Sequence, residues 1–109
     1  MNDRLLSLLG LSRKAGKVQI GFDPVKDAIE TGKAELILTA ADISANTAKK
    51  IKVVAEDFGV ELICINRSKE ELSFALGKTC ALVAVTDKGF SKKLKELTLA
   101  ECNEGGNDL

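Results

Sequence analysis

The chain contains no histidine, no tryptophan and no tyrosine, and its only aromatic residues are four phenylalanines. Without histidine it lacks the commonest general base and a common metal ligand. A cysteine nucleophile would also have no imidazole partner to activate it. Because aromatic rings are scarce, large platforms for stacking unpaired bases are scarce too. A nucleic-acid reader of this composition has to use backbone, amide and basic groups.

Other signatures of chemistry are also missing. No glycine-rich segment matches a phosphate-binding loop or a dinucleotide fingerprint. Asp42 and Asp87 each follow an apolar segment, where ligands often bind in α/β folds, but a turn or helix-capping role is the simpler interpretation. We therefore expect no catalytic centre, no metal site and no cofactor.

The three cysteines are too few and too widely spaced for a disulfide framework or a zinc knuckle. They are Cys64, Cys80 and Cys102. The first two fall within apolar segments, which predicts buried thiols in a reducing compartment. The apolar stretch at the N-terminus is too short and too interrupted for a signal peptide or a membrane span. We expect a cytoplasmic monomer that does not contact a membrane.

Charge is balanced overall but not along the chain. There are 16 acidic and 16 basic residues, so the formal net charge is zero. Three of the acidic residues, Glu101, Glu104 and Asp108, lie in a C-terminal segment rich in glycine and asparagine. The rest of the chain has 13 acidic residues against 16 basic ones, a net charge of about +3. This mild basic bias permits RNA binding without requiring it.

Apolar residues recur with helical spacing in five segments, separated by short apolar runs typical of strands. Helices are expected over 3–15, from Asp23-Pro24 to Gly32, from Ser44 to Gly59, from the capping box Ser68/Glu71 to Gly77, and from about Phe90 to Leu99. Strands are expected at 18–20, 36–40, 60–66 and 80–86, and the last three are continuously apolar. Such strands are typical of a sheet covered by helices on both faces. The prediction is an α/β three-layer α/β/α sandwich with a mixed four-stranded sheet and about five helices. It forms one domain over residues 1–99, followed by a flexible acidic tail at 100–109.

Four segments carry a recognisable pattern in a fixed order. They are Gly21–Gly32 (GFDPVKDAIETG), Leu36–Asp42 (LILTAAD), Ser44–Lys50 (SANTAKK) and Ser68–Lys78 (SKEELSFALGK), the last leading into the strand through Val85. Together they resemble the ribosomal protein L7Ae family, whose members bind kink-turn RNA, and the match is closest to its short bacterial members. The similarity covers roughly residues 3–98. It implies the same sandwich and an RNA-binding function.

The first of these segments departs from the family's pattern. In kink-turn binders an Asn, a Glu and a Lys reach the sheared G·A pairs; the corresponding residues here are Asp23, Pro24 and Asp27. Only Gly21 matches, and Lys26 is basic but one position early. Asp23 accepts hydrogen bonds where Asn also donates them, and Asp27 brings negative charge towards phosphates. Both changes weaken a site whose affinity is largely electrostatic.

Other features compensate for these departures. Three basic residues lie close in sequence to the helix that begins at Asp23-Pro24 and are expected to bind phosphates. Gly77 lets the backbone approach RNA closely. The candidate RNA-binding residues are Arg13, Lys14, Lys17, Gly21, Phe22, Asp23, Lys26, Leu76, Gly77, Lys78 and Thr79. Lys49, Lys50 and Lys52 are interpreted instead as a solvated helix face.

The function expected from these features is non-catalytic recognition of a kink-turn or similar internal loop in ribosomal RNA, in association with the ribosome. Two alternatives stay open. One is a protein-interaction module that kept the fold and lost the RNA site. The other is a detached substrate-binding domain related to rRNA methyltransferases, since the chain is too short to include a cofactor-binding catalytic domain.

Overall fold

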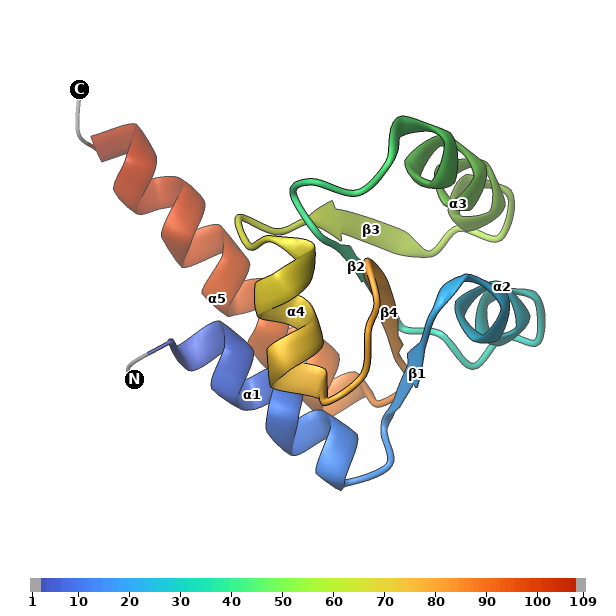
Figure 1. Ribbon diagram of the computed structural model, residues 1–109, viewed down its shortest axis with the longest axis horizontal. Helices are drawn as coiled ribbons and strands as arrows, with labels where there is room; N and C mark the ends of the chain where they lie inside the picture. The colour runs from blue at the N-terminus through green and yellow to red at the C-terminus, as the bar shows by residue number, and fades with distance from the viewer. Residues whose placement is uncertain (1–2, 108–109) are drawn as a thin grey trace.

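The computed structural model describes the backbone of residues 3–107 and the side chains of residues 3–101. Helices and strands alternate along this part of the chain (Figure 1). The elements are α1 (Arg4–Lys14), β1 (Val18–Ile20), α2 (Phe22–Glu30), β2 (Leu36–Thr39), α3 (Ala45–Asp57), β3 (Glu61–Cys64), α4 (Lys69–Leu76), β4 (Leu82–Val85) and α5 (Lys88–Asn107). None of the helices in the described residues is both long and apolar enough to cross a bilayer.

The four strands form one mixed sheet in the order β1-β4-β2-β3. β4 is antiparallel to both of its neighbours, β1 and β2, whereas β2 and β3 are parallel. The strands β1, β2 and β3 therefore share one direction, and their C-terminal ends lie at the same end of the sheet. β4 begins at that end, because its Leu82 pairs with Thr39 at the end of β2.

Helices cover both faces of the sheet, which confirms the three-layer sandwich. In Figure 1, α1, α4 and α5 lie on one side of the sheet and α2 and α3 on the other. Successive side chains of a strand point to opposite faces, so the buried central strands β2 and β4 feed two cores. Leu36 and Leu38 pack in the core beneath α1, α4 and α5. Ile37 and Ala84 pack in the core beneath α2 and α3.

Most of the helix starts follow local capping signals. Asp3 caps α1 by accepting a hydrogen bond from the Leu6 N–H (3.1 Å), and Ser44 caps α3 by accepting one from the Thr47 N–H (3.2 Å). The expected capping box of α4 is present, with Ser68 and Glu71 each accepting from the other's backbone.

The start of α2 differs from the prediction. The helix is capped by Gly21 and begins at Phe22, so Asp23 and Pro24 are its second and third residues rather than its cap and first residue. Gly21 has φ +99° and ψ 164°, a conformation open essentially to glycine alone. Its carbonyl accepts the first intrahelical bond, from the Val25 N–H (3.0 Å). Pro24 fits here because the early N–H groups of a helix have no partner in any case.

The prediction that β3 is buried is wrong. β3 is an edge strand; its end residues, Glu61 and Cys64, are exposed and the two between them are half-buried. Cys64 at its end is exposed, against expectation. Cys80 is buried as expected, and burial raises the pKa of its thiol. The side chain of Cys102 lies outside the described residues.

The expected end of the last helix near Leu99 is also wrong. α5 continues to Asn107, so Ala100 and Glu101 belong to the helix and not to a tail. Glu101 is held there by an ion pair with Arg67. The side chains of residues 102–109, which include the acidic Glu104 and Asp108, lie outside the described part of the chain.

Candidate nucleic-acid interface

The N-terminus of α2 meets the start of β4 at one end of the sheet. The Gly21 N–H donates to the Leu82 carbonyl (3.3 Å), and the Ala40 N–H donates to the Ala81 carbonyl (2.8 Å). The loop that precedes β4 is thus fixed between the ends of β1 and β2. Two segments about 60 residues apart, each a candidate from the sequence, become neighbours there.

This loop, residues 77–81, has a defined conformation. The Ser73 hydroxyl accepts from the Cys80 N–H (3.0 Å) and donates to the Cys80 carbonyl (3.1 Å), which ties the loop back to α4. Gly77 caps α4 in the left-handed conformation, with φ +69°. Lys78 and Thr79 are exposed in the loop.

Leu76, a candidate from the sequence, does not belong to the surface. It is fully buried in the core beneath α1, α4 and α5. Its side chain can fix the position of the loop, but it has no route to contact RNA. Only its neighbours in the loop remain candidates for direct contact.

Arg13, Lys14 and Lys17 form a basic cluster at the C-terminal end of α1. All three are exposed, and the Lys17 N–H bonds back to the Ser12 carbonyl at the end of α1 (2.9 Å). The Arg13 guanidinium packs over Gly77, because a Cβ on that glycine would lie 3.6 Å from Arg13 Nη1. Arg13 therefore adjoins the loop.

Lys17 is not next to the start of α2, although it is close in sequence. Its carbonyl accepts from the Thr86 N–H (2.8 Å) at the far end of β4. The length of β1 separates it from Gly21, roughly 13 Å at the rise of a strand. The basic candidates thus form two groups, one at the C-terminal end of α1 and one on α2.

The second group lies on α2 and faces a groove. Phe22 and Lys26 line an open groove between α2 and α3, of about 510 Å³. Asp23 and Asp27 are exposed on the same helix, and Asp23 lies in its first turn. These two carboxylates place negative charge at the positions that correspond to the Asn and Lys of the family's motif.

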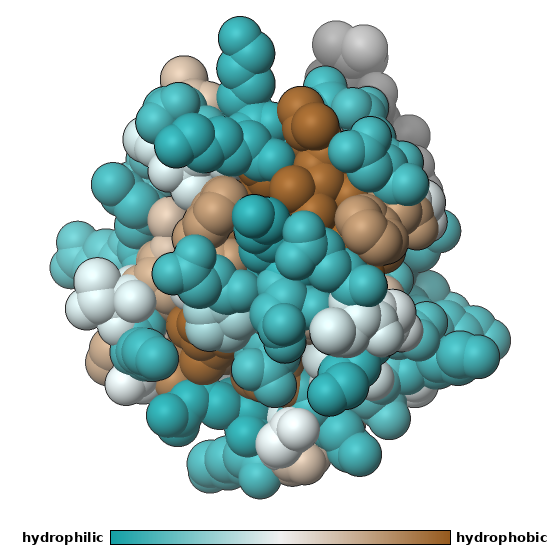
Figure 2. Space-filling view, turned by 90° about the vertical axis from the view of Figure 1, so that its right-hand side faces the viewer, coloured by the Kyte–Doolittle hydropathy of each residue, from teal (hydrophilic) through white to brown (hydrophobic). Residues whose placement is uncertain are grey.

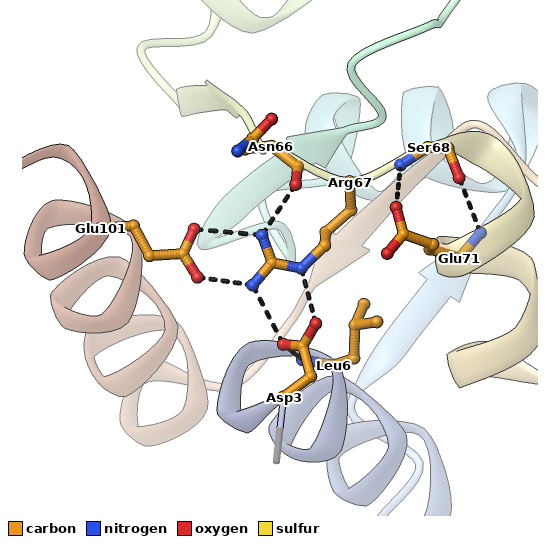
Figure 3. A network of polar contacts seen from close by, with 7 residues as sticks. All are labelled: Asp3, Leu6, Asn66, Arg67, Ser68, Glu71 and Glu101. Carbon is orange, nitrogen blue, oxygen red and sulfur yellow. Dashed lines mark hydrogen bonds and ion pairs between the residues drawn. The ribbon is translucent and has the colours of Figure 1, made fainter. Parts of the chain in front are cut away.

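Arg67 forms a polar cluster that the sequence did not single out (Figure 3). Its guanidinium donates to both carboxylate oxygens of Asp3 (2.7 and 3.0 Å), to both of Glu101 (3.2 and 2.6 Å) and to the Asn66 carbonyl (2.7 Å). These five bonds use every N–H of the side chain, which is 14% exposed. Hydrogen bonds from Arg67, more than any other contact, hold the pKa of Asp3 below its ordinary value. Arg67 therefore joins α1, β3 and α5 and has no N–H left for a phosphate.

The two carboxylates considered for catalysis have capping roles. Asp42 accepts from the Lys69 N–H at the start of α4 (2.7 Å), and Asp87 accepts from the Phe90 N–H in the first turn of α5 (2.9 Å). The turn-and-cap interpretation of both residues is confirmed.

A second groove, of about 550 Å³, lies between α1 and α4. Leu11 and Phe74 line it and are 56% and 86% exposed, and Lys14 lies at the same groove. A single exposed apolar side chain is common on a protein surface. Two large ones that line the same groove mark a surface able to contact another molecule.

The comparisons with known proteins agree with one another. The model of the ribosomal protein L7Ae/L30e/S12e/Gadd45 family matches residues 3–95. The chain is 40% identical over 91 residues to the RNA-binding protein YlxQ of Bacillus subtilis, covering 83% of this chain and 90% of that one. It is 34% identical over 95 residues to the protein of that name from Enterococcus faecium, covering 86% and 90%.

Two solved structures share the fold. A protein of unknown function from Bacillus halodurans superimposes with a TM-score of 0.82 at 29% identity, covering 87% of this chain and 96% of that one. The 15.5 kD RNA-binding protein of Giardia lamblia superimposes with a TM-score of 0.74 at 21% identity, covering 92% of each chain. The four-stranded mixed sheet and its helices are therefore those of this family.

Proposed function

The chain belongs to the ribosomal protein L7Ae/L30e/S12e/Gadd45 family, and from this premise we propose that it is a non-catalytic RNA-binding protein that recognises a kink-turn or a related internal loop. We propose further that this RNA is ribosomal and that the protein associates with the ribosome. Relatives named for RNA binding support the first part of the proposal.

One observation carries this proposal: the loop at residues 77–81 meets the start of α2 at Leu82, Arg13 packs over Gly77 of that loop, and Lys26 lies on α2. A loop of small residues, tied to α4, allows RNA to come close to the backbone, while the flanking charges neutralise phosphates.

Recognition would depend on the shape of the RNA more than on its bases. An A-form major groove is too narrow for side chains, so proteins read irregular sites where bases are splayed. Asp23 and Asp27 replace the side chains that read the sheared pairs, so base contacts are reduced. Binding would stabilise a bent RNA through phosphate contacts on two sides and close packing of the loop.

A salt titration tests this proposal. Binding of the full chain to a kink-turn RNA is measured beside binding to a straight duplex of equal length, between about 50 and 200 mM salt. We expect tighter binding to the kink-turn, weakening as salt rises. Equal affinity for both RNAs, or no binding to either, would overturn kink-turn recognition.

Charge variants locate the site. The double variant Arg13→Glu/Lys17→Glu removes two proposed phosphate contacts, so the slope of log K against log salt should become shallower by about 2. The control is Lys33→Glu/Lys52→Glu, which makes the same change in net charge at exposed positions away from the loop. Equal loss in both double variants would show a general charge effect and no site.

A second candidate function, a protein-interaction module, is favoured by the exposed Phe74 and Leu11. Co-sedimentation with ribosomes separates the two functions. If RNA contacts hold the complex, Arg13→Glu/Lys17→Glu releases the protein from ribosomes and Phe74→Ser does not. If a ribosomal protein holds it through the groove between α1 and α4, Phe74→Ser releases it.

A further inference from the structure

The groove between α2 and α3 combines an apolar floor with a basic rim. Phe22, Val53 and Val54 supply the apolar surface, and Val53 is 52% exposed although it is a valine on a packed helix. Figure 2 looks onto the face that α2 and α3 form and shows apolar surface open between hydrophilic side chains.

Three lysines complete the lining of the groove: Lys26, Lys49 and Lys50. Among the side chains that the structure describes, no acidic one lines it. Within the described side chains, the ion pairs join Arg67 to Asp3 and Glu101, and Lys95 to Glu61, so the three lysines take part in none of them. The charge of this rim is therefore available to an anionic occupant. The occupant must also present an apolar surface to the floor.

The groove begins where the proposed RNA site ends. Phe22 directly follows Gly21, whose N–H bonds to Leu82 at the start of β4. Lys26 lies one turn further along α2, and on α3 the lining runs from Lys49 to Val54. At the rise of a helix the groove spans about 6 Å of α2 and about 7–8 Å of α3. This length suits one or two nucleotides of a strand that continues past the loop.

We propose that this groove holds an unpaired extension of the bound RNA, with a base against Phe22 and Val53 and its phosphates at the lysines. A nucleotide has both properties that the groove selects, an apolar base face and an anionic backbone, and stacking of bases on an aromatic ring tolerates any sequence. Lys49 and Lys50 then have a role beyond that of a solvated helix face. The inference rests on the proposed function, because it extends the same RNA site.

The test compares two RNAs with the full chain. One is a kink-turn RNA with blunt stems; the other carries two unpaired nucleotides at one strand end, tried at each end in turn. We expect roughly tenfold tighter binding of one extended RNA, the size of effect that one stacked base gives. Lys50→Glu should abolish this gain. Lys52→Glu, on the same helix but outside the groove lining, should keep it.

The outcomes separate this inference from the proposed function. If the kink-turn is bound better than a duplex but neither extension adds affinity, the groove proposal fails and the proposed function stands. If no kink-turn is bound, a single-stranded octanucleotide is tested alone. Octanucleotide binding that Lys50→Glu abolishes and Lys52→Glu spares would then support the groove proposal by itself, and absence of that binding would overturn the proposal.

A competition experiment with polyglutamate also tests the groove proposal. Displacement of the octanucleotide or of the extension by polyglutamate at equal charge would overturn the proposal, because the groove would then suit an acidic protein segment as well as RNA.

Discussion

At the scale of single residues, two serine hydroxyls in the fold have opposite environments. Ser73 makes two hydrogen bonds to Cys80 and holds the loop of residues 77–81. Ser91 is buried, and its Oγ has no hydrogen-bond partner among the described residues. A buried polar group without a partner lowers stability, whereas removing one member of a bonded pair leaves the other unsatisfied.

We therefore predict that Ser73→Ala lowers the free energy of unfolding by about 1–2 kcal/mol. The Cys80 amide should also exchange its hydrogen faster, because it loses its acceptor. Ser91→Ala should be neutral or raise stability by up to about 1 kcal/mol. Urea unfolding measures both variants. Equal losses in the two would contradict the assigned roles of these hydroxyls.

The Asp3–Arg67 contact predicts a pH dependence. Arg67 holds the pKa of Asp3 below its ordinary value, so the unfolded chain binds this proton more readily than the folded one. The stability that the contact contributes is present above about pH 5 and is lost as pH falls towards the folded pKa.

Asp3→Asn should thus lower the free energy of unfolding by about 1–2 kcal/mol at pH 7 and by much less at pH 3. The amide oxygen still accepts from Leu6, which keeps the cap of α1. Urea unfolding at both pH values measures the difference. A loss of the same size at both would show that the geometry of the hydrogen bonds to Arg67, and not the charge of Asp3, is what stabilises the fold.

At the scale of elements, the start of α2 depends on one backbone conformation. Gly21 has φ +99° and ψ 164°, which side chains disfavour by about 1–3 kcal/mol. We predict that Gly21→Ala lowers the free energy of unfolding by that amount and weakens RNA binding, because the start of α2 shifts. Gly32→Ala is the control: Gly32 lies at the other end of the helix with φ +76° and open space around it. It should cost about 1 kcal/mol and leave RNA affinity unchanged.

Local signals explain which elements could be predicted from the sequence. The caps at Ser44 and Ser68, like the left-handed Gly77, depend on residues within four positions, and all three were correct. The burial of β3 was wrong because its edge position follows from the strand order, which no single segment encodes. The end of α5 was wrong because Glu101 is held by Arg67, 34 positions earlier in the chain.

The candidate site was predictable only in part, for the same reason. The contact of Arg13 with Gly77 and that of Gly21 with Leu82 join residues about 60 positions apart, so only the family resemblance suggested that these segments belong together. The burial of Leu76 is set by the packing of α4. The groove at Lys49 and Lys50 arises from the packing of α3 beside α2, and helical periodicity alone assigns them to solvent.

At the scale of the whole molecule, a net charge of zero hides an uneven surface. Arg13 lies beside the loop at 77–81 and lysines line the groove between α2 and α3, whereas Asp23 and Asp27 place negative charge on α2. Nucleic-acid affinity follows the number of phosphates that are neutralised, so local charge at this position outweighs net charge.

Asp27→Lys should consequently raise affinity for a kink-turn RNA several-fold at low salt and steepen the salt slope by about 1. The change removes a repulsive charge and restores the lysine of the family's motif. Asp27 is exposed, so the free energy of unfolding should stay within about 0.5 kcal/mol. Glu30→Lys makes the same change in net charge on the same helix, one turn further from Gly21, and should raise affinity much less. If both variants gain equally, RNA responds to the overall charge of the protein; a gain confined to Asp27→Lys places the phosphates at the first turns of α2.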